Sequence, residues 1–150
     1  MEILLINDDL LAGLRQKAEG NERKRLNYDL RTTPDDSSQR MLNALLPGTV
    51  VPIHRHPNST ETVILLRGKM VEVMYDEENP SVDFPQGMDA QDVPSGRRLR
   101  EAARYVLDSS NGSHGCVVPK GTWHTVEVVE PSVIFEAKDG RYGEDGSEIW

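Results

Sequence analysis

Apolar side chains near the start of the chain recur with a helical period. Asn7 or Asp8 precedes this stripe as a capping residue, and Asp8 and Asp9 place negative charge in the first turn, where the helix dipole favours it. Gly20 follows the stripe and is typical of a left-handed helix end. The pattern predicts a short helix over about 7–20, whose apolar stripe consists of Leu10, Leu11, Leu14 and Ala18.

From about Gln39 onward the apolar period shortens to that of strands. Many short apolar pieces separated by Gly, Pro and Asn are typical of a β-sandwich or barrel, so we expect an all-β fold over about 39–142. The strand candidates are Met41–Leu46, Thr49–Ile53, Glu61–Leu66, Met70–Tyr75, Tyr105–Leu107, Cys116–Val118, Thr125–Val129 and Val133–Glu136.

Two segments interrupt this pattern. Residues 32–38 contain Pro34 and two Asp residues, which is typical of a turn or loop. Residues 80–103 have weak periodicity, and we interpret them as an excursion between strands, with either one helical turn around 98–103 or a flexible flap. The whole chain of 150 residues suits a single domain.

The composition excludes several classes of protein. A net charge of −8 opposes binding to nucleic acid or to an anionic membrane surface. The apolar runs are far shorter than the roughly 20 residues that span a bilayer. The sequence starts without a charged-then-apolar leader, and its single cysteine, Cys116, cannot form an intrachain disulfide. We therefore expect a cytoplasmic protein in which Cys116 is buried and unreactive.

The histidines suggest a metal site. His54 and His56 are two residues apart in a strand-like context, so their side chains point to the same face. Glu61 and His124 add a carboxylate and a third imidazole, a set that suits a divalent transition metal. On spacing alone, a His-x-His pair is more often structural or on the surface than a ligand pair.

The surrounding residues change that balance. The segment from Gly48 to Gly68, which includes the first three candidate ligands at fixed spacing, resembles the first cupin motif, and Pro119-x-Gly121-x-x-His124 resembles the core of the second. Ser113 and Val128 stand where the second motif usually has Gly and Asn. The resemblance implies a cupin (double-stranded β-helix or jelly-roll) barrel with a short N-terminal helix.

A narrower resemblance extends over about residues 3–142. Over this range the chain is similar to the WbuC-type cupin metalloproteins, although Asp29 and Arg31 stand at positions where that group has Asn and His. That group is associated with surface-polysaccharide (O-antigen) gene sets. The similarity rests on Arg23-x-Arg25-x-Asn27, Gln39-Arg40, the segment 52–57, the segment 119–125 and the tail 135–142.

The resemblance implies roles for individual residues. His54, His56, Glu61 and His124 would hold one divalent ion (Fe, Mn, Ni, Co or Zn), and Glu61 has the alternative role of a base. Substrate, an anionic sugar for example, would contact Arg23, Arg25, Asn27, Gln39, Lys138 and Tyr142, and Glu136 is a candidate second pocket carboxylate. The alternative for Arg23, Arg25 and Asn27 is a solvated linker. We interpret Trp123 as core packing or pocket wall, and Arg55, on the opposite face from the histidines, as a surface or dimer-interface charge.

Two functions remain open at this point. The first is a metal-dependent enzyme acting on a small polar or sugar-derived molecule, such as an isomerase, epimerase or dioxygenase. The second is a non-catalytic metal- or sugar-binding cupin, which includes a metal site retained only for stability. In either case we expect a homodimer, because an open sheet edge favours association.

Overall fold

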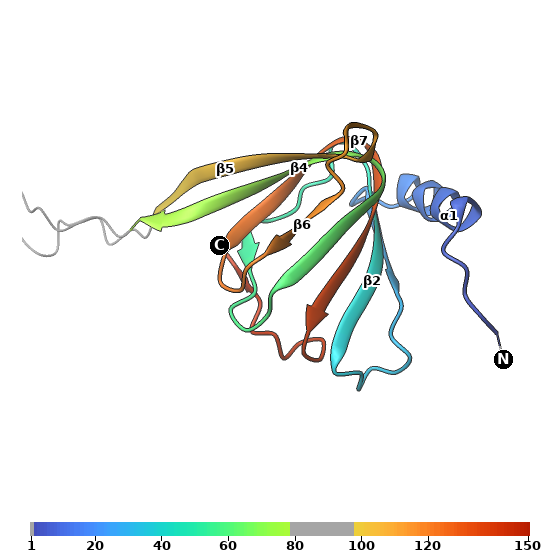
Figure 1. Cartoon of the computed structure of the whole chain (residues 1–150), viewed down its shortest axis with the longest axis horizontal. Helices are drawn as coiled ribbons and strands as arrows, with labels where there is room; N and C mark the ends of the chain where they lie inside the picture. Colours follow the sequence, from blue (N-terminus) through green and yellow to red (C-terminus); the bar gives the residue numbers. More distant parts are fainter. Residues whose placement is uncertain (1, 79–97) are drawn as a thin grey trace, which may run out of the picture.

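The computed structural model describes residues 2–78 and 98–150, which form one helix lying against a curled β-sheet (Figure 1). Strands account for most of the described chain, which confirms the prediction of an all-β fold with a short N-terminal helix. In chain order the elements are α1 (Asp8–Glu19), β1 (Arg25–Asp29), β2 (Ser38–Leu45), β3 (His54–Arg55), β4 (Glu61–Glu78), β5 (Arg98–Asp108), a 3-10 turn (Ser109–Asn111), β6 (Gly115–Val118), β7 (Trp123–Asp139) and β8 (Glu148–Ile149).

The helix forms where the apolar stripe predicts it. The side chain of Asn7 caps α1 by accepting a hydrogen bond from the Leu10 backbone N–H at 3.1 Å. Leu11, Leu14 and Ala18 are buried against the sheet. The expected left-handed end is wrong, because Gly20 has φ −82° and remains in the right-handed region. A left-handed residue follows instead at Lys24, with φ 55°.

The long strands β4 and β7 pair antiparallel along most of their length and bend together. The pairing shifts register between Leu65 and Met70, close to Gly68, which has φ +95°. A Cβ atom at Gly68 would lie 2.3 Å from the backbone oxygen of Pro131, so the close approach of the two strands requires glycine there. This bend curls the sheet into the hollow that holds the candidate site.

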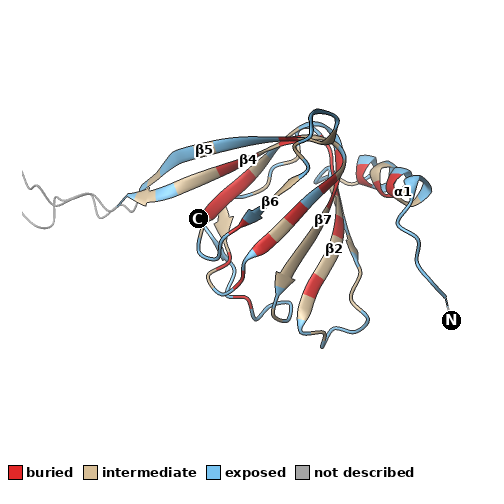
Figure 2. Ribbon diagram, viewed as in Figure 1, coloured by how far each residue is buried: buried red, intermediate tan, exposed pale blue. Residues whose placement is uncertain are grey.

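The sheet has an apolar cluster on each face. On the outer face, the buried side chains of α1 pack against Leu42, Ala44 and Val133. On the inner face, Leu45 and Ile134 pack with apolar residues of β4 and β5. Figure 2 shows these buried positions alternating with more exposed ones along β2 and β4. The alternation follows from the period of two in a strand.

Several boundaries differ from the expectations. Residues 49–53 form no strand, and the short strand β3 lies just after them. Residues 98–103 belong to β5 and not to a helical turn, because β5 pairs with β4 over its whole length. The rest of the predicted excursion, residues 80–97, lies outside the described residues. The strands β1 and β8 were not predicted.

Among the described residues, no helix combines the length and the apolar character that a membrane span requires.

Candidate metal centre

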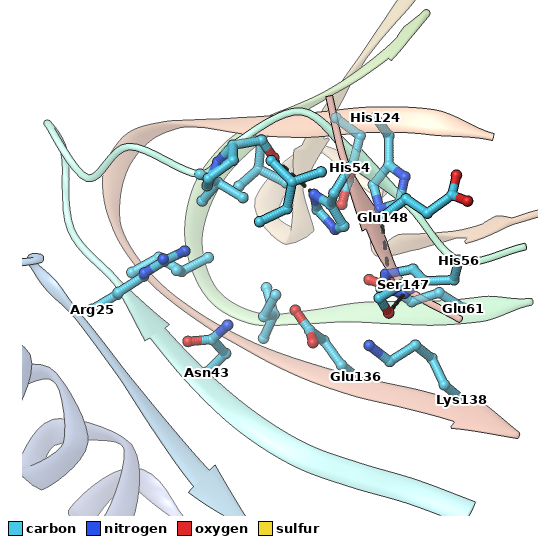
Figure 3. A pocket seen from close by; sticks show the side chains of 17 residues that line it. Arg25, Asn43, His54, His56, Glu61, His124, Glu136, Lys138, Ser147 and Glu148 are labelled. Atoms are coloured by element: carbon cyan, nitrogen blue, oxygen red, sulfur yellow. Dashed lines mark hydrogen bonds and ion pairs between the residues drawn. The ribbon is translucent and has the colours of Figure 1, made fainter. Parts of the chain in front are cut away.

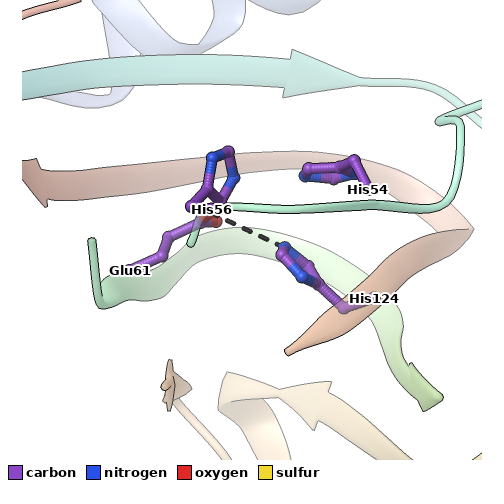
Figure 4. A group of neighbouring side chains, drawn as sticks. All are labelled: His54, His56, Glu61 and His124. Atoms are coloured by element: carbon purple, nitrogen blue, oxygen red, sulfur yellow. Dashed lines mark ion pairs between the residues drawn. The ribbon is translucent and has the colours of Figure 1, made fainter. Parts of the chain in front are cut away.

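Four of the predicted ligands converge in the hollow of the sheet. His54, His56, Glu61 and His124 each offer one ligand atom, and these atoms all lie within 4.8 Å of one another (Figure 4). His54 in β3 is directly opposite His124 in β7, and Glu61 is the first residue of β4. The three short segments that carry the ligands are therefore brought together by strand pairing.

Hydrogen bonds fix the orientation of the three imidazoles. Nδ1 of His54 lies 2.8 Å from the carbonyl oxygen of Pro52, and Nδ1 of His124 lies 2.9 Å from that of Thr122. A carbonyl can only accept, so each of these Nδ1 atoms carries the proton and each Nε2 presents a lone pair. Nδ1 of His56 lies 2.7 Å from the Ser147 hydroxyl oxygen and 3.4 Å from a carboxylate oxygen of Asp145.

The geometry fits a bound cation. Nε2 of His56 and Nε2 of His124 are buried and have no hydrogen-bond partner, although they lie 3.1 and 3.7 Å from the same carboxylate oxygen of Glu61. Lone pairs that face a carboxylate in a buried site are unfavourable unless a proton or a metal ion lies between them. Three imidazole nitrogens and one carboxylate are donors that suit a divalent transition metal.

The protonation of His54 and Glu61 agrees with a ligand role, whereas His124 is held toward its charged form by Glu61. Burial and the neighbouring His124 lower the pKa of His54 to about 4, so its imidazole is neutral at pH 7. Burial opposes ionisation of Glu61, but the nearby imidazoles of His124 and His56 outweigh it and hold its pKa below the ordinary value. Burial also disfavours the charged form of His124, yet its interaction with Glu61 raises its pKa overall.

A cavity of about 270 Å³ adjoins the ligand cluster (Figure 3). Apolar side chains such as Leu45, Val51 and Ile134 form part of its wall. Its polar lining beyond the four ligands includes Arg25, Asn43, Glu72, Glu136 and Lys138. In Figure 3, Arg25 lies at the end of the cavity away from the histidines, with Asn43 and Glu136 between the two ends.

Two cavity carboxyl groups ionise with difficulty. Burial, reinforced by the charge of Glu61, raises the pKa of Glu72 to about 8 and that of Glu136 to about 7. Glu136 was a candidate in the sequence, but Glu72 and Asn43 were missed. A signal for Glu72 was present, because it is in phase with Met70 and Met74 in an alternating strand and therefore faces inward.

The structure separates the predicted substrate-binding residues into three groups. Arg25 and Lys138 line the cavity beside the ligands. Asn27, Gln39 and Tyr142 line a second hollow of about 170 Å³ at the edge formed by β1 and β2. Arg23 lines neither hollow, and its backbone carbonyl accepts a hydrogen bond from Thr49. The residues expected to form one set therefore do not all meet at one place.

The segment 145–150 completes the site and was not anticipated. Strand β8 pairs with β3, which places Ser147, Glu148 and Ile149 on the cavity wall. Asp145 contacts His56 and also lies 3.4 Å from the side-chain nitrogen of Gln39 and 3.9 Å from that of Lys138. This segment is short and has few apolar residues, so it shows no alternating pattern from which a strand could be predicted.

Residues on the far side of β3 hold this segment in place. Arg55 stacks over Trp123, 4.5 Å from the ring centroid, and forms an ion pair with Glu148 at 2.5 Å. Trp123 is buried and contacts the ring of Trp150, with centroids 5.1 Å apart. The interpretation of Trp123 as core packing is confirmed, and the partners of Arg55 lie within its own chain.

Cys116 is half-buried in β6 and less enclosed than expected. Burial and the nearby carboxylates of Glu72 and Glu61 raise the pKa of its thiol to about 12. The thiol is therefore protonated at neutral pH, which agrees with the expectation that it is unreactive.

The curled sheet has the cupin (jelly-roll) fold, as its similarity to solved structures shows. Its structure is similar to oxalate oxidase in complex with the substrate analogue glycolate (TM-score 0.55, 16% identity, covering 86% of this chain and 56% of that chain). It is equally similar to a dTDP sugar isomerase from Desulfovibrio desulfuricans G20 (TM-score 0.55, 20% identity, covering 82% and 72%). A third similar structure is Bacillus subtilis oxalate decarboxylase (TM-score 0.50, 17% identity, covering 83% and 27%). This chain thus spans little more than half the length of the oxalate oxidase chain.

The chain belongs to the family described as a domain of unknown function (DUF6016), whose model matches residues 6–83. No curated protein sequence matches it.

Proposed function

We propose that this protein is a metal-dependent enzyme that acts on a small polar or sugar-derived molecule. The observation that carries the proposal is the convergence of four ligand atoms, two of them buried imidazole nitrogens without a partner, beside a cavity large enough for a small molecule. A site that served only to stabilise the fold would not need a cavity lined by further charged groups. The proposed ligands are His54, His56, Glu61 and His124.

The similar structures support the choice of chemistry. One of them binds glycolate as a substrate analogue, one has Mn(II) centres, and one is named as an isomerase of a dTDP sugar. Because these similarities are below 25% identity, they establish the fold and leave the reaction to be determined. An isomerase, an epimerase and a dioxygenase all remain compatible with three imidazoles and one carboxylate.

The chain's own residues supply binding groups and proton carriers. When bound, a divalent metal would act as a Lewis acid on an oxygen of the substrate. Lys138 and Arg25 place positive charge in the cavity, where they can orient an anionic substrate. Glu136, with a pKa of about 7, can hold or release a proton near neutral pH, which is what a general acid or base requires.

Several finer assignments belong to the same proposal. We place the protein among the WbuC-type cupins, as a single cupin domain over residues 1–150 that functions in the cytoplasm in surface-polysaccharide biosynthesis. Asn27, Gln39 and Tyr142, around the second hollow, and Arg23 would contact outlying parts of a substrate. Among the described strands β1 pairs only with β2, and this open edge supports a homodimer, which light scattering on the purified protein tests.

Metal analysis tests the central claim. Mass spectrometry of untagged protein should find about one equivalent of Fe, Mn, Ni, Co or Zn, and a His54→Ala/His56→Ala double variant should lose it. The identity of the metal then selects the assay: oxygen consumption for Fe, and isomerase or epimerase screens on sugars for the others. Absence of metal from the wild type, even after reconstitution, would refute the four-ligand site.

Turnover separates an enzyme from a binding protein. The enzyme should convert a bound substrate, and substitution of Glu136 by Gln should lower the rate while metal content and ligand affinity stay close to the wild type. Saturable binding without conversion, over the whole screen, would instead favour the non-catalytic metal- or sugar-binding cupin.

A further inference from the structure

The cavity contains a set of buried polar atoms that have nothing to bind. Among the described residues, six buried side-chain nitrogen or oxygen atoms have no hydrogen-bond partner, and five of them belong to residues that line this cavity. These five are Arg25 Nε, Asn43 Oδ1, His56 Nε2, Glu72 Oε2 and His124 Nε2. Buried polar groups in native proteins nearly always have partners, so a concentration of unpaired ones indicates where a ligand completes the structure.

The order of these atoms along the cavity restricts the chemistry of the ligand. The two histidine nitrogens lie at the metal end of the cavity. A metal ion held there would bind a carboxylate or hydroxyl oxygen of the ligand. Arg25 at the opposite end is a donor with a buried, unpaired Nε; it forms no direct ion pair with the described residues, although the charge of Glu136 acts on it. A guanidinium without a direct ion pair is suited to bind the anionic group of a ligand.

The middle of the cavity calls for a donor on the ligand. Asn43 donates a hydrogen bond from its amide to the carboxyl of Glu136, but its Oδ1 atom is buried and unpaired. An amide oxygen accepts only, so a hydroxyl of the ligand would satisfy it. A ligand with oxygen ligands at one end, an anion at the other and a hydroxyl between them matches all three positions.

The size of the cavity limits how large that ligand is. Its volume of about 270 Å³ lies below the range of about 300–1,000 Å³ that holds drug-sized ligands. A free acid of about four to six carbons fits this space, whereas a nucleotide-linked sugar would leave its nucleotide outside. The apolar wall formed by Leu45, Val51 and Ile134 offers no further partners for charge.

We infer that the substrate is a small hydroxy acid with a second anionic group, which binds the metal at one end and Arg25 at the other. This inference rests on the proposed metal-dependent function and specifies its substrate class. A carboxylate and a phosphate both present anionic oxygens to Arg25, so the experiment includes both. Arg100, which is exposed on β5 and lines neither hollow, provides a matched comparison.

Calorimetric titration of the metal-loaded protein tests the inference with defined probes. D-Glucarate and L-tartrate carry two carboxylates and hydroxyls, 6-phospho-D-gluconate carries a carboxylate, hydroxyls and a phosphate, and D-glucose is neutral. At least one of the three anions should bind about tenfold more tightly than D-glucose, since a hydrogen bond to a charged group is stronger than one between neutral groups. The anion that binds best identifies carboxylate or phosphate as the preferred group.

Substitutions then assign the effect to Arg25. Arg25→Gln should weaken binding of that anion about tenfold or more, Arg25→Lys should have an intermediate effect, and Arg100→Gln should stay within about threefold of the wild type. Unchanged thermal unfolding and metal content in each variant exclude misfolding. Equal affinity of the wild type and Arg25→Gln, or D-glucose binding as tightly as the acids, would overturn the inference.

The same experiment separates this inference from the proposed function. If the wild type takes up no metal, the metal-dependent function fails, and the titrations are repeated on the metal-free protein. Binding of an anion that depends on Arg25 would then still support the anionic end of the site. Its absence there would overturn that part as well.

Discussion

The two faces of strand β2 differ in how completely their buried side chains are satisfied. Leu42 and Ala44 face outward, have no exposed surface and pack against α1. Asn43, the residue between them, faces inward and keeps an unpaired oxygen in the cavity. Adjacent residues of one strand thus have different roles. The outer-face residues stabilise the fold by packing, and the inner-face residue keeps a polar atom free for a ligand at some cost in stability.

The largest effect should come from the outer face. Leu42→Ala removes a fully buried side chain from the cluster beneath α1 and should lower the free energy of unfolding by about 2–5 kcal/mol. Metal content should be unchanged in the folded protein, because Leu42 points away from the cavity. Chemical denaturation and mass spectrometry measure the two quantities, and loss of metal in the folded variant would break the distinction between the faces.

On the inner face, the substitution Glu72→Gln should raise stability at alkaline pH, whereas Leu42→Ala on the outer face lowers it. The pKa of Glu72 is raised to about 8 in the folded state, against 4.5 in the unfolded chain, so the folded state favours the protonated carboxyl. Its contribution to stability is fully present below pH 4.5 and is lost as the pH rises through about 8. Glu72→Gln removes this loss.

The stability of Glu72→Gln relative to the wild type should therefore increase between pH 5 and pH 8.5. We expect a gain above about 1.4 kcal/mol, the equivalent of one unit of pKa shift. Denaturation of chelator-treated protein at both pH values measures it. A difference that does not change with pH would show that Glu72 ionises normally in the folded protein.

A smaller effect is expected from Ser147, which lies outside the ligand set. Its hydroxyl contacts Nδ1 of His56 at 2.7 Å, so Ser147→Ala should weaken metal binding about tenfold by leaving that imidazole less well oriented. Competition with a chelator of known affinity measures the change. Ser110→Ala, which removes an exposed hydroxyl far from the site, is the control and should have no effect.

The smallest expected change concerns Cys116. A thiol with a pKa of about 12 is almost fully protonated at pH 8, so a thiol reagent should modify the folded protein much more slowly than the unfolded chain. The time course of modification with and without denaturant measures this ratio. Similar rates in the two states would show that the thiol of Cys116 is open to solvent in the folded protein.

How much of the site the sequence predicts depends on how local its signals are. His54 and His56 are two residues apart in a strand-like context, and the motifs around them and around His124 have fixed spacing, so all four candidate ligands could be predicted. Arg23 and Arg25 show the same pattern in the sequence, but only the paired register of β1 and β2 places Arg25 in the cavity and leaves Arg23 outside. The fold class followed from the strand period and the motifs, whereas the position of residues 98–103 depended on the distant partner β4.

Contacts between distant segments explain what was missed. The position of Ser147 beside His56 depends on the pairing of β8 with β3 and on the ion pair of Arg55 with Glu148. Each of these contacts spans about ninety residues of sequence, and contacts of that kind leave no local pattern. Glu72 is different, since its inward phase was visible in the alternation of β4 and was overlooked.

The pairing of β8 with β3 also sets an order of events during protein synthesis. The four ligands have all left the ribosome before Ser147 does, so the nascent chain has the donors for a metal ion before it has the group that orients His56. The site reaches its final geometry only when residues 145–149 return to β3. An ion that met the four proposed ligands before this pairing formed would meet a site that is still adjustable.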